Sequence, residues 1–400
     1  MDDNIMKKIA YLLKTSKKLY IVYFFLFSSI LKVLGFFVKT EEKLILFNSY
    51  GGKKMDDSPK AIYDAMCNDE RFNMYRMVWA LQEPKLYKDR NIESVKCDTL
   101  KFFILALKAK VWVTNSSIER GLSFKKKSTI CFNTWHGTTI KKMGNDIQDD
   151  NLSFRGMNHV SADVMLAQSQ YDINIFSQAF EIPKERFYCI GLPRNDILVN
   201  YKREDALLVR KKLGIPEDKK ILLYAPTFRE YTTGKEKEVI LHIPISLDYW
   251  QQRLEKEYVV LFRAHYEVAK HMDVSGYSAF IDVSSYHCLN DLLIVSDALI
   301  SDYSSIFFDY SIMHKPMYCF AYDYEEYIEN RGMYLDLKKE LPCVMHKEEE
   351  SLIDEIVNNT NNNLEKIKIF QNKYVAECGD AARKSCDILY RMLTQSKRIK

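Results

Sequence analysis

The chain has 400 residues, of which 47% are hydrophobic and 28% are charged, a composition typical of globular proteins and unlike that of disordered ones. The formal net charge of +4 is too small to indicate nucleic acid as a partner, and the length favours two domains over one. Nine cysteines without a CxxC pair argue against a zinc site and are typical of buried thiols in a reducing compartment.

Residues 1–40 combine basic residues, among them Lys7, Lys8 and Lys14, with the apolar run Leu19–Val38, which is about long enough to cross a bilayer as a helix. A signal peptide would need a small-residue cleavage site, and none is evident. Lys32 interrupts the run, and a lysine inside a span costs about 2.5–3.5 kcal/mol. We therefore expect a membrane-associated helix lying on the cytoplasmic face of the membrane. A true span and a buried helix are the alternatives.

Beyond Thr40, short apolar runs alternate with helical stretches, which is the pattern of parallel βαβ units. The predicted strands are Lys43–Phe47, Tyr75–Ala80, Val111–Thr114, Ser128–Asn133, Val164–Ala167, Phe187–Ile190, Ile221–Tyr224, Tyr258–Phe262, Ala279–Val283, Leu292–Ile300 and Pro316–Cys319. The predicted helices are Pro59–Cys67, Thr99–Ala109, Gln170–Phe180 and Asp205–Leu213, and the residues from Glu348 onward read as two more.

The pattern restarts near residue 200, so we predict an α/β protein with one domain over residues 41–200, a second over 201–400, and a cleft between them. Four polar motifs follow four of the predicted strands. In an open α/β sheet, ligands bind beyond the carboxyl ends of the strands, so these motifs predict a site for an anionic substrate. The motifs are Thr134–Thr139, Ala225–Arg229, Arg263–His265 and Ser301–Ser305.

The last of these motifs predicts a phosphate site. Asp302 can cap the following helix, and the hydroxyls of Ser304 and Ser305 then fall in its first turn beside free backbone amides. Asp309 lies on the same helix and is expected to support the site. A plain capped helix without a ligand is the alternative.

The two histidines beyond strand ends are candidate catalytic residues. His136 precedes Gly137, which permits close backbone approach, and an imidazole at such a turn is a plausible general base toward a hydroxyl. Arg263 and His265 project to the same side if the strand geometry persists, which suits a guanidinium and an imidazole that grip phosphate. Structural roles in loops are the alternative for all three side chains.

Two further turns offer polar groups, namely Thr227 with Arg229, and Arg194 with Asn195 near the expected domain crossover. No HExxH, P-loop or GxGxxG motif occurs, which argues against zinc proteases, Walker-type ATPases and nicotinamide enzymes. No acidic cluster suited to Mg²⁺ stands out, so we assign no metal ligand and no cofactor, and a metal requirement stays open.

Taken together, these motifs resemble those of the CDP-glycerol glycerophosphotransferase family of bacterial teichoic acid synthesis. The resemblance covers roughly Lys43–Leu389 and agrees in order and spacing. One departure is Pro342-Cys343, where relatives often have Pro-Gly. The resemblance extends to Pro59–Tyr63, Val111–Asn115, Asn133–Thr138, Gly191–Asp196, Tyr224–Arg229, Arg263–His265 and Asp302–Tyr310.

This resemblance implies a GT-B-like fold of two Rossmann-like domains, the first for the acceptor and the second for the CDP donor. It also implies transfer of glycerol phosphate, or a related alditol phosphate, from a CDP-alditol to a lipid-linked saccharide or polymer at the cytoplasmic membrane surface, with release of CMP. By position, it implies that His136 and His265 are catalytic, with Gly137 and Thr138 supporting the former. It also implies that Ser304 and Ser305 bind phosphate. From the motifs themselves we expect the donor or its phosphates to be bound by Arg263, Asp302, Thr227, Arg229, Arg194 and Asn195 as well.

Three alternatives stay open at this stage. A GT-B glycosyltransferase that uses a nucleotide sugar for capsule or wall polysaccharide would need a similar cleft, anion site and base. The enzyme could add a single unit, as a primase, or build a polymer, and the short amino-terminal region favours the primase-like architecture. A catalytically inactive scaffold is the third, and the intact histidines and arginines argue against it.

Overall fold

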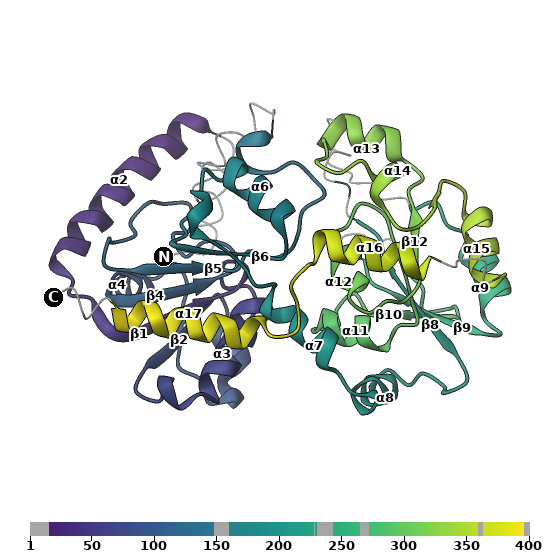
Figure 1. Cartoon of the computed structure of the whole chain (residues 1–400), viewed down its shortest axis with the longest axis horizontal. Helices are drawn as coiled ribbons and strands as arrows, with labels where there is room; N and C mark the ends of the chain where they lie inside the picture. The colour runs from purple at the N-terminus through teal and green to yellow at the C-terminus, as the bar shows by residue number, and fades with distance from the viewer. Residues whose placement is uncertain are drawn as a thin grey trace. The chain divides into compact units, whose positions relative to one another are not determined.

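The computed structural model describes residues 16–147, 160–227, 229, 243–264, 272–358 and 363–395. They form two compact units, each built around its own sheet (Figure 1). The first unit comprises the described residues up to His136, Met143–Arg194 and those from Asp380 onward, and the second comprises Gly137–Lys142 and Asn195–Gly379. Lys7, Lys8 and Lys14, the basic residues that precede the predicted membrane-associated helix, lie outside the described residues.

The sheet of the first unit has seven parallel strands in the order β3-β2-β1-β4-β5-β6-β7. The strands are β1 (Glu41–Asn48), β2 (Arg76–Leu81), β3 (Ser94–Lys96), β4 (Ala109–Thr114), β5 (Ile130–Asn133), β6 (Val164–Ala167) and β7 (Phe187–Cys189). The helices are α2 (Lys17–Phe37), α3 (Asp57–Cys67), α4 (Leu100–Lys108), α6 (Gln170–Ala179) and α17 (Ala381–Gln395).

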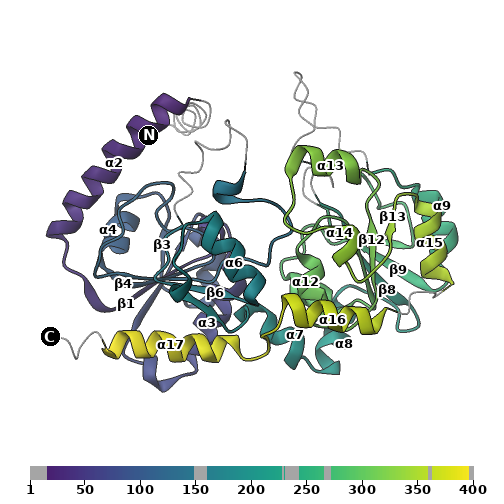
Figure 2. The same cartoon turned by 45° about the horizontal axis from the view of Figure 1, so that its top comes forward.

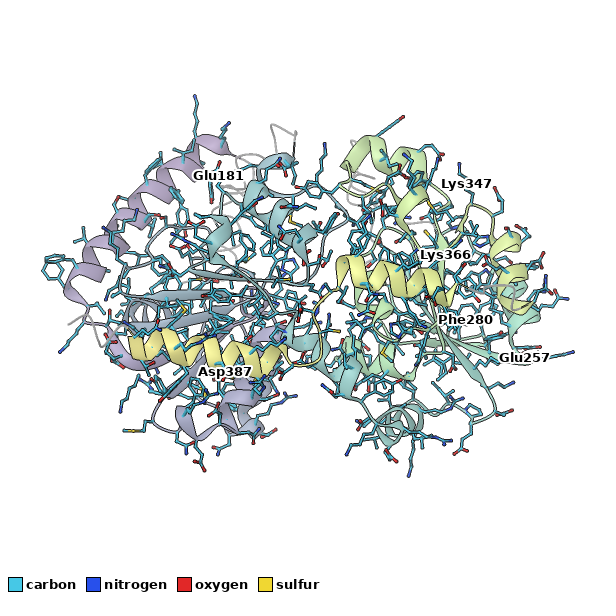
Figure 3. The ribbon with its side chains drawn as sticks, in the orientation of Figure 1. Glu181, Glu257, Phe280, Lys347, Lys366 and Asp387 are labelled. Carbon is cyan, nitrogen blue, oxygen red and sulfur yellow. The ribbon has the colours of Figure 1, made fainter. Side chains whose placement is uncertain are left out.

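Strand β1 shows why this sheet is covered on both faces. Ile45 and Phe47 belong to one apolar cluster, with residues of α3 and α17, whereas Leu44 and Leu46 belong to another, with residues of α4. Strands buried on both faces read as continuous apolar runs, which is why β1 was recognisable in the sequence. On α17, Asp387 is labelled in Figure 3. Its carboxylate lies 2.8 Å from the guanidinium of Arg71.

Helix α2 lies along the outside of the first unit in both ribbon views (Figures 1 and 2). Its narrow buried face consists of Ser28, Leu31 and Gly35. The Ser28 hydroxyl accepts a hydrogen bond from the Ser123 amide at 3.0 Å, and the Tyr20 hydroxyl donates to the Gly121 carbonyl at 3.0 Å. Most of the other exposed side chains of the helix are apolar, although Lys17, Lys18 and Lys32 are exposed as well, and side chains project outward along it (Figure 3).

The sheet of the second unit has six parallel strands in the order β10-β9-β8-β11-β12-β13. The strands are β8 (Lys220–Ala225), β9 (Tyr258–Phe262), β10 (Phe280–Asp282), β11 (Ala298–Ser301), β12 (Met317–Phe320) and β13 (Met345–His346). The helices are α7 (Asp196–Asn200), α8 (Arg203–Lys212), α9 (Leu247–Leu254), α11 (Leu289–Val295), α12 (Ile306–Ser311), α13 (Tyr324–Arg331), α14 (Leu337–Glu340), α15 (Glu349–Val357) and α16 (Leu364–Tyr374).

Both sheets share one topology, because each starts in its middle, runs to one edge and then reverses to the other side. The reversal lies between β1 and β4 in the first unit and between β8 and β11 in the second. This is the strand order of the Rossmann fold, in which the reversal point opens a crevice for ligands at the carboxyl ends of the strands. The predicted α/β class with parallel sheets is therefore confirmed, while the cleft between domains stays a prediction.

Two predictions of secondary structure were wrong. The run Leu292–Ile300 is not one strand, because Leu289–Val295 forms α11 and only Ala298–Ser301 forms β11. The Ser296 hydroxyl donates to the Leu292 carbonyl and the Asp297 carboxylate accepts from the Ile221 amide, so these two polar residues end the helix and start the strand. An apolar run of this length does not reveal its own periodicity.

The residues from Glu348 onward form three helices, α15, α16 and α17, instead of two. The last of these helices, α17, also lies in the first unit instead of the predicted second domain. Helix α17 packs against α3, and Cys386, Ile388 and Leu389 are buried in the core of the first unit. Residues 201–400 therefore do not all belong to the second unit, because the apolar face of α17 packs into the core of the first.

Candidate active site

The carboxyl ends of β1, β4, β5 and β7 carry the polar groups of the first unit. Gly51 and Gly52 follow β1 with φ values of 62° and 85°, a region that side chains rarely adopt. A Cβ at Gly52 would lie 2.5 Å from the Cys97 sulfur, so only glycine fits this turn. The turn brings Tyr50 to the loop after β4, where the Tyr50 amide donates to the Asn115 side chain at 2.8 Å.

His136 follows β5 and is partly exposed. Its Nδ1 lies 2.8 Å from the carbonyl oxygen of Asn115. A carbonyl can only accept, so Nδ1 carries the proton, and in the neutral imidazole Nε2 is left as the proton acceptor. Burial lowers the pKa of His136 below its ordinary value, which keeps the ring neutral near pH 7. The Trp135 ring stacks on it at 4.2 Å between centroids.

Arg194 and Asp57 complete the surroundings of this histidine. Arg194 Nη1 donates to the His136 carbonyl at 2.9 Å and to the Asp57 carboxylate at 2.7 Å. The Tyr50 hydroxyl donates to the same carboxylate, and the Tyr50 ring lies 6.0 Å from the imidazole. We call His136, Asn115, Arg194, Asp57 and Tyr50 the histidine site. A neutral imidazole with a fixed tautomer and one available nitrogen can act as a general base.

Arg194 was predicted to bind the donor, whereas Asp57 and Tyr50 were not predicted as site residues. The structure places Arg194 in the first unit, with its guanidinium engaged by Asp57 and the His136 backbone. Asp57 reads in the sequence as an ordinary acidic residue at a helix start. Its positive φ of 64° and its partner 137 positions away leave no local signal.

In the second unit, Arg229 is the centre of a buried cluster at the carboxyl ends of β8 and β11. Its guanidinium donates to both oxygens of Asp323 at 2.7 and 2.9 Å and to Asp302 at 2.8 Å. Although burial opposes its charge, these carboxylates raise the pKa of Arg229 above its ordinary value. We call Arg229, Asp302 and Asp323 the arginine cluster. It is surrounded by the rings of Tyr303, Tyr322 and Tyr327.

The direct phosphate contacts predicted for Arg229 and Asp302 do not fit this geometry. Arg229 is 4% exposed and Asp302 is 2% exposed, and each is used inside the protein. Asp302 accepts from the Thr227 amide and from Arg229, so it ties the loop after β8 to the loop after β11. Both residues hold these loops in place, a role that depends on partners about 75 positions apart and is invisible in either motif alone.

Asn195 also differs from its predicted role as a donor ligand. It is fully buried, and its side-chain amide donates to the Asp309 carboxylate at 2.7 Å. This bond joins the residue where the chain enters the second unit to α12. The bond ties Asp309, a residue of α12, to Asn195, and the predicted supporting role of Asp309 at the site stays a prediction.

Four predicted residues do lie at the carboxyl ends of adjacent strands in the second unit. Thr227 follows β8, Arg263 follows β9, and Ser304 and Ser305 follow β11. Ser304 and Ser305 are partly exposed, and the Ser305 hydroxyl makes no hydrogen bond within the described part of the chain. Arg263 Nη1 donates to the Val283 and Tyr286 carbonyls, which fixes its direction. We call these four residues the strand-end site.

The remaining predicted site residues are Gly137, Thr138 and His265. Gly137 has a φ of 138°, which suits glycine, and it is buried with Thr138 directly after His136 in the chain. His265 lies outside the described residues. Among the residues that the structure does describe, no group of three or more His, Cys, Asp or Glu side chains could hold a metal ion.

The chain was compared with known protein families and with individual proteins. The model of the CDP-glycerol:poly(glycerophosphate) glycerophosphotransferase family matches residues 30–390. The chain is 32% identical over 372 residues to a teichoic acid glycerol-phosphate transferase of Staphylococcus aureus, covering 88% of the chain and 93% of that protein. It is 35% identical over 334 residues to a teichoic acid poly(glycerol phosphate) polymerase of Staphylococcus epidermidis, covering 79% of the chain but only 45% of that protein.

Solved structures agree with the sequence relatives. The wall teichoic acid polymerase TagF matches with a TM-score of 0.81 and 31% identity, over 96% of this chain and 98% of the matched chain. An H444N variant of TagF, soaked with CDPG, matches with the same TM-score at 30% identity, over 96% of this chain and 99% of that one.

Proposed function

The chain belongs to the CDP-glycerol:poly(glycerophosphate) glycerophosphotransferase family, and from that premise we propose that it transfers glycerol phosphate from CDP-glycerol to a hydroxyl of a lipid-linked acceptor in teichoic acid synthesis, releasing CMP. The observation that carries the proposal is the histidine site. The Asn115 carbonyl fixes the proton on Nδ1 of His136, which leaves Nε2 to accept the proton of an incoming hydroxyl. The donor is supported by TagF, whose H444N variant was soaked with CDPG.

The proposed reaction is a single displacement at phosphorus. The acceptor oxygen attacks the β-phosphorus of CDP-glycerol, the bond from that phosphorus to the bridging oxygen breaks, and CMP leaves with that oxygen. The hydroxyl proton passes to Nε2 of His136. Phosphoryl-type transfer depends chiefly on positioning and on stabilising the charge that shifts to the leaving group, so no covalent intermediate is needed.

The strand-end site is proposed to hold the diphosphate of the donor. Ser304 and Ser305 offer hydroxyls, and Arg263 offers a guanidinium whose direction is fixed by two carbonyls. The arginine cluster is proposed to keep the loops of this site in place without touching CDP-glycerol, because the N–H groups of Arg229 already bind Asp302 and Asp323. His265 stays proposed as the second catalytic histidine near the phosphates.

A donor panel tests the proposal. The purified protein is incubated with CDP-glycerol, CDP-ribitol and UDP-sugars in the presence of a lipid-linked acceptor, and release of CMP or UDP is measured. Release of CMP from CDP-glycerol, with glycerol phosphate joined to the acceptor, is expected. UDP release from a nucleotide sugar would instead identify a glycosyltransferase, and no release from any donor would indicate a scaffold. The length of the product on the acceptor separates a primase from a polymerase.

We also propose that the protein binds the cytoplasmic membrane surface through α2. This is the one described helix that is long and apolar enough to cross a bilayer, with a mean hydropathy of 2.0. It contacts the first unit near both ends, through Tyr20 and Gly35, while its outer face is exposed, with Phe36 at 86%. A helix held along a soluble unit with an apolar outer face suits a position in the membrane interface.

Flotation with vesicles that contain anionic phosphatidylglycerol tests this placement. The wild-type protein is expected to float with the vesicles and to be released by alkaline carbonate, as a peripheral protein is. The double variant Phe25→Glu and Val33→Glu, at positions 62% and 60% exposed, is expected to stay in solution. The matched control Leu86→Glu changes a residue that is 77% exposed elsewhere in the first unit. Resistance to carbonate would indicate a spanning helix.

A further inference from the structure

Asp57 combines burial, charge and an unusual backbone conformation next to the histidine. It is the first residue of α3, its side chain is 3% exposed, and its φ is 64°. A residue other than glycine in this region costs on the order of 1 kcal/mol, and such residues persist where the surroundings hold them. Tyr50 and Trp135, with φ values of 49° and 50°, share this feature.

The contacts of Asp57 lead directly to His136. One oxygen of the carboxylate accepts from the Tyr50 hydroxyl and from Arg194 Nη1, and the other accepts from the Ser58 amide at 2.6 Å. The same Arg194 nitrogen donates to the carbonyl of His136. A single nitrogen therefore connects the Asp57 carboxylate to the backbone of the histidine.

The carboxylate is ionised in this arrangement. Burial by itself would raise the pKa of Asp57, but the Arg194 guanidinium, the Tyr50 hydroxyl and the Ser58 amide outweigh burial and lower it below the ordinary value. A buried ion pair of this kind contributes little net stability, because desolvation offsets the attraction. The contribution of this pair therefore lies in the geometry that it imposes on its neighbours.

We infer that Asp57 is a positioning residue for the proposed transfer: through Arg194 and Tyr50 it sets where the imidazole of His136 lies, and its charge stabilises the imidazolium formed when Nε2 takes the proton. The inference rests on the proposed function and adds a residue to it. Among the described residues of the first unit, the charged groups that face His136 are Asp57 and Arg194, and the Tyr50 ring lies 6.0 Å from the imidazole. Burial and Arg194 disfavour the imidazolium, and Asp57 favours it.

The main test is Asp57→Asn, which keeps the size of the side chain and removes its charge. We expect kcat for CMP release to fall by about tenfold or more, since small misplacements of catalytic groups have effects of that size, with KM for the donor nearly unchanged. The acid limb of the kcat profile should move to lower pH, because the imidazolium has lost its favourable neighbour. The matched control is Asp64→Asn, on the same helix, where the carboxylate is about half exposed and paired with Lys60.

A purely structural role for Asp57 predicts a different result. Folded Asp57→Asn would then have the kcat and the acid limb of Asp64→Asn, and that outcome would overturn the inference. If Asp57→Asn does not fold, Arg194→Lys is measured instead. This change keeps a positive charge beside Asp57 but removes the planar guanidinium that donates to the Asp57 carboxylate and to the His136 carbonyl. Reduced kcat with unchanged KM supports the inference, and normal kcat overturns it.

A titration separates this inference from the proposed function. The histidine Cε1–H resonances are followed against pH by NMR in protein with labelled histidine, and His136 is assigned with His136→Gln. In Asp57→Asn the His136 resonance should titrate at lower pH than in the wild type and in Asp64→Asn. Equal midpoints in all three proteins would overturn the inference. A wild type that releases no CMP from CDP-glycerol would contradict the proposed function while leaving this measurement valid.

Discussion

The histidine site and the arginine cluster both contain an arginine paired with a buried aspartate at the carboxyl ends of parallel strands, yet they differ in what the pair surrounds. In the histidine site, one nitrogen of Arg194 donates both to the Asp57 carboxylate and to the His136 carbonyl, and Nε2 of the imidazole stays available to accept a proton. In the arginine cluster, Arg229 is enclosed by two carboxylates and three tyrosine rings. A charged residue at a strand end is therefore a candidate for chemistry only while some of its bonding capacity remains unused.

The largest expected effect tests the histidine side of this comparison. Replacing His136 with Ala should lower kcat by about 10²- to 10⁴-fold, the range for a positioned general base, while the affinity for CDP-glycerol survives. Steady-state CMP release and calorimetric donor binding measure the two quantities. The control is His314→Asn, which changes an exposed histidine bonded to Gln371 and keeps a residue type suited to its φ of 51°. Normal turnover in the His136 variant would remove the histidine site from the mechanism.

The next effect should appear in stability instead of chemistry. Arg229→Met leaves the carboxylates of Asp302 and Asp323 buried without their partner, and breaking a buried pair in this way costs about 3–5 kcal/mol. The free energy of unfolding, from denaturant titration, is the measurement. Arg203→Met, on α8 in the same unit, is the control because Arg203 is exposed. A stable, folded Arg229→Met protein with a raised donor KM would show that Arg229 contacts the donor after all.

A smaller change is expected when the strand-end site is altered. Ser304→Ala and Ser305→Ala should each raise the donor KM by about tenfold, the value of a hydrogen bond to a charged group, with kcat and stability nearly unchanged. Ser275→Ala, at an exposed position in the second unit, serves as the control. If the serine variants matched Ser275→Ala in KM, the donor phosphates would have to bind elsewhere.

The smallest effect concerns pH. Because burial lowers the pKa of His136, the acid limb of kcat/KM in the wild type should have its midpoint below 6.5, the ordinary value for imidazole. Activity is then retained at neutral pH and lost as the pH falls through the midpoint, where Nε2 becomes protonated. Rates measured between pH 5 and 8 give this midpoint, and a midpoint above 7 would contradict a base that is neutral at pH 7.

The sequence predicted the order of most strands and helices because strands buried on both faces are continuous apolar runs, as in β1 and β4. It also located His136 and Ser304, since both follow such runs directly. What it missed depends on distant partners. Asp57 is informative only through Arg194, and Arg229 changes from a candidate ligand to a structural residue only once Asp323, 94 positions later, is seen beside it. The division of Leu292–Ile300 between α11 and β11 likewise depended on polar contacts that periodicity does not carry.

Helix α17 has a consequence for the order in which the protein can be made. It packs on α3, the helix that begins with Asp57, yet it is synthesised after every strand of both sheets. During translation the amino-terminal sheet therefore leaves the ribosome with part of its apolar face uncovered, and about 190 further residues follow β7 before Cys386, Ile388 and Leu389 can cover it. A chain that lacked α17 would leave this part of the core exposed, and an exposed core is what chaperones and proteases bind.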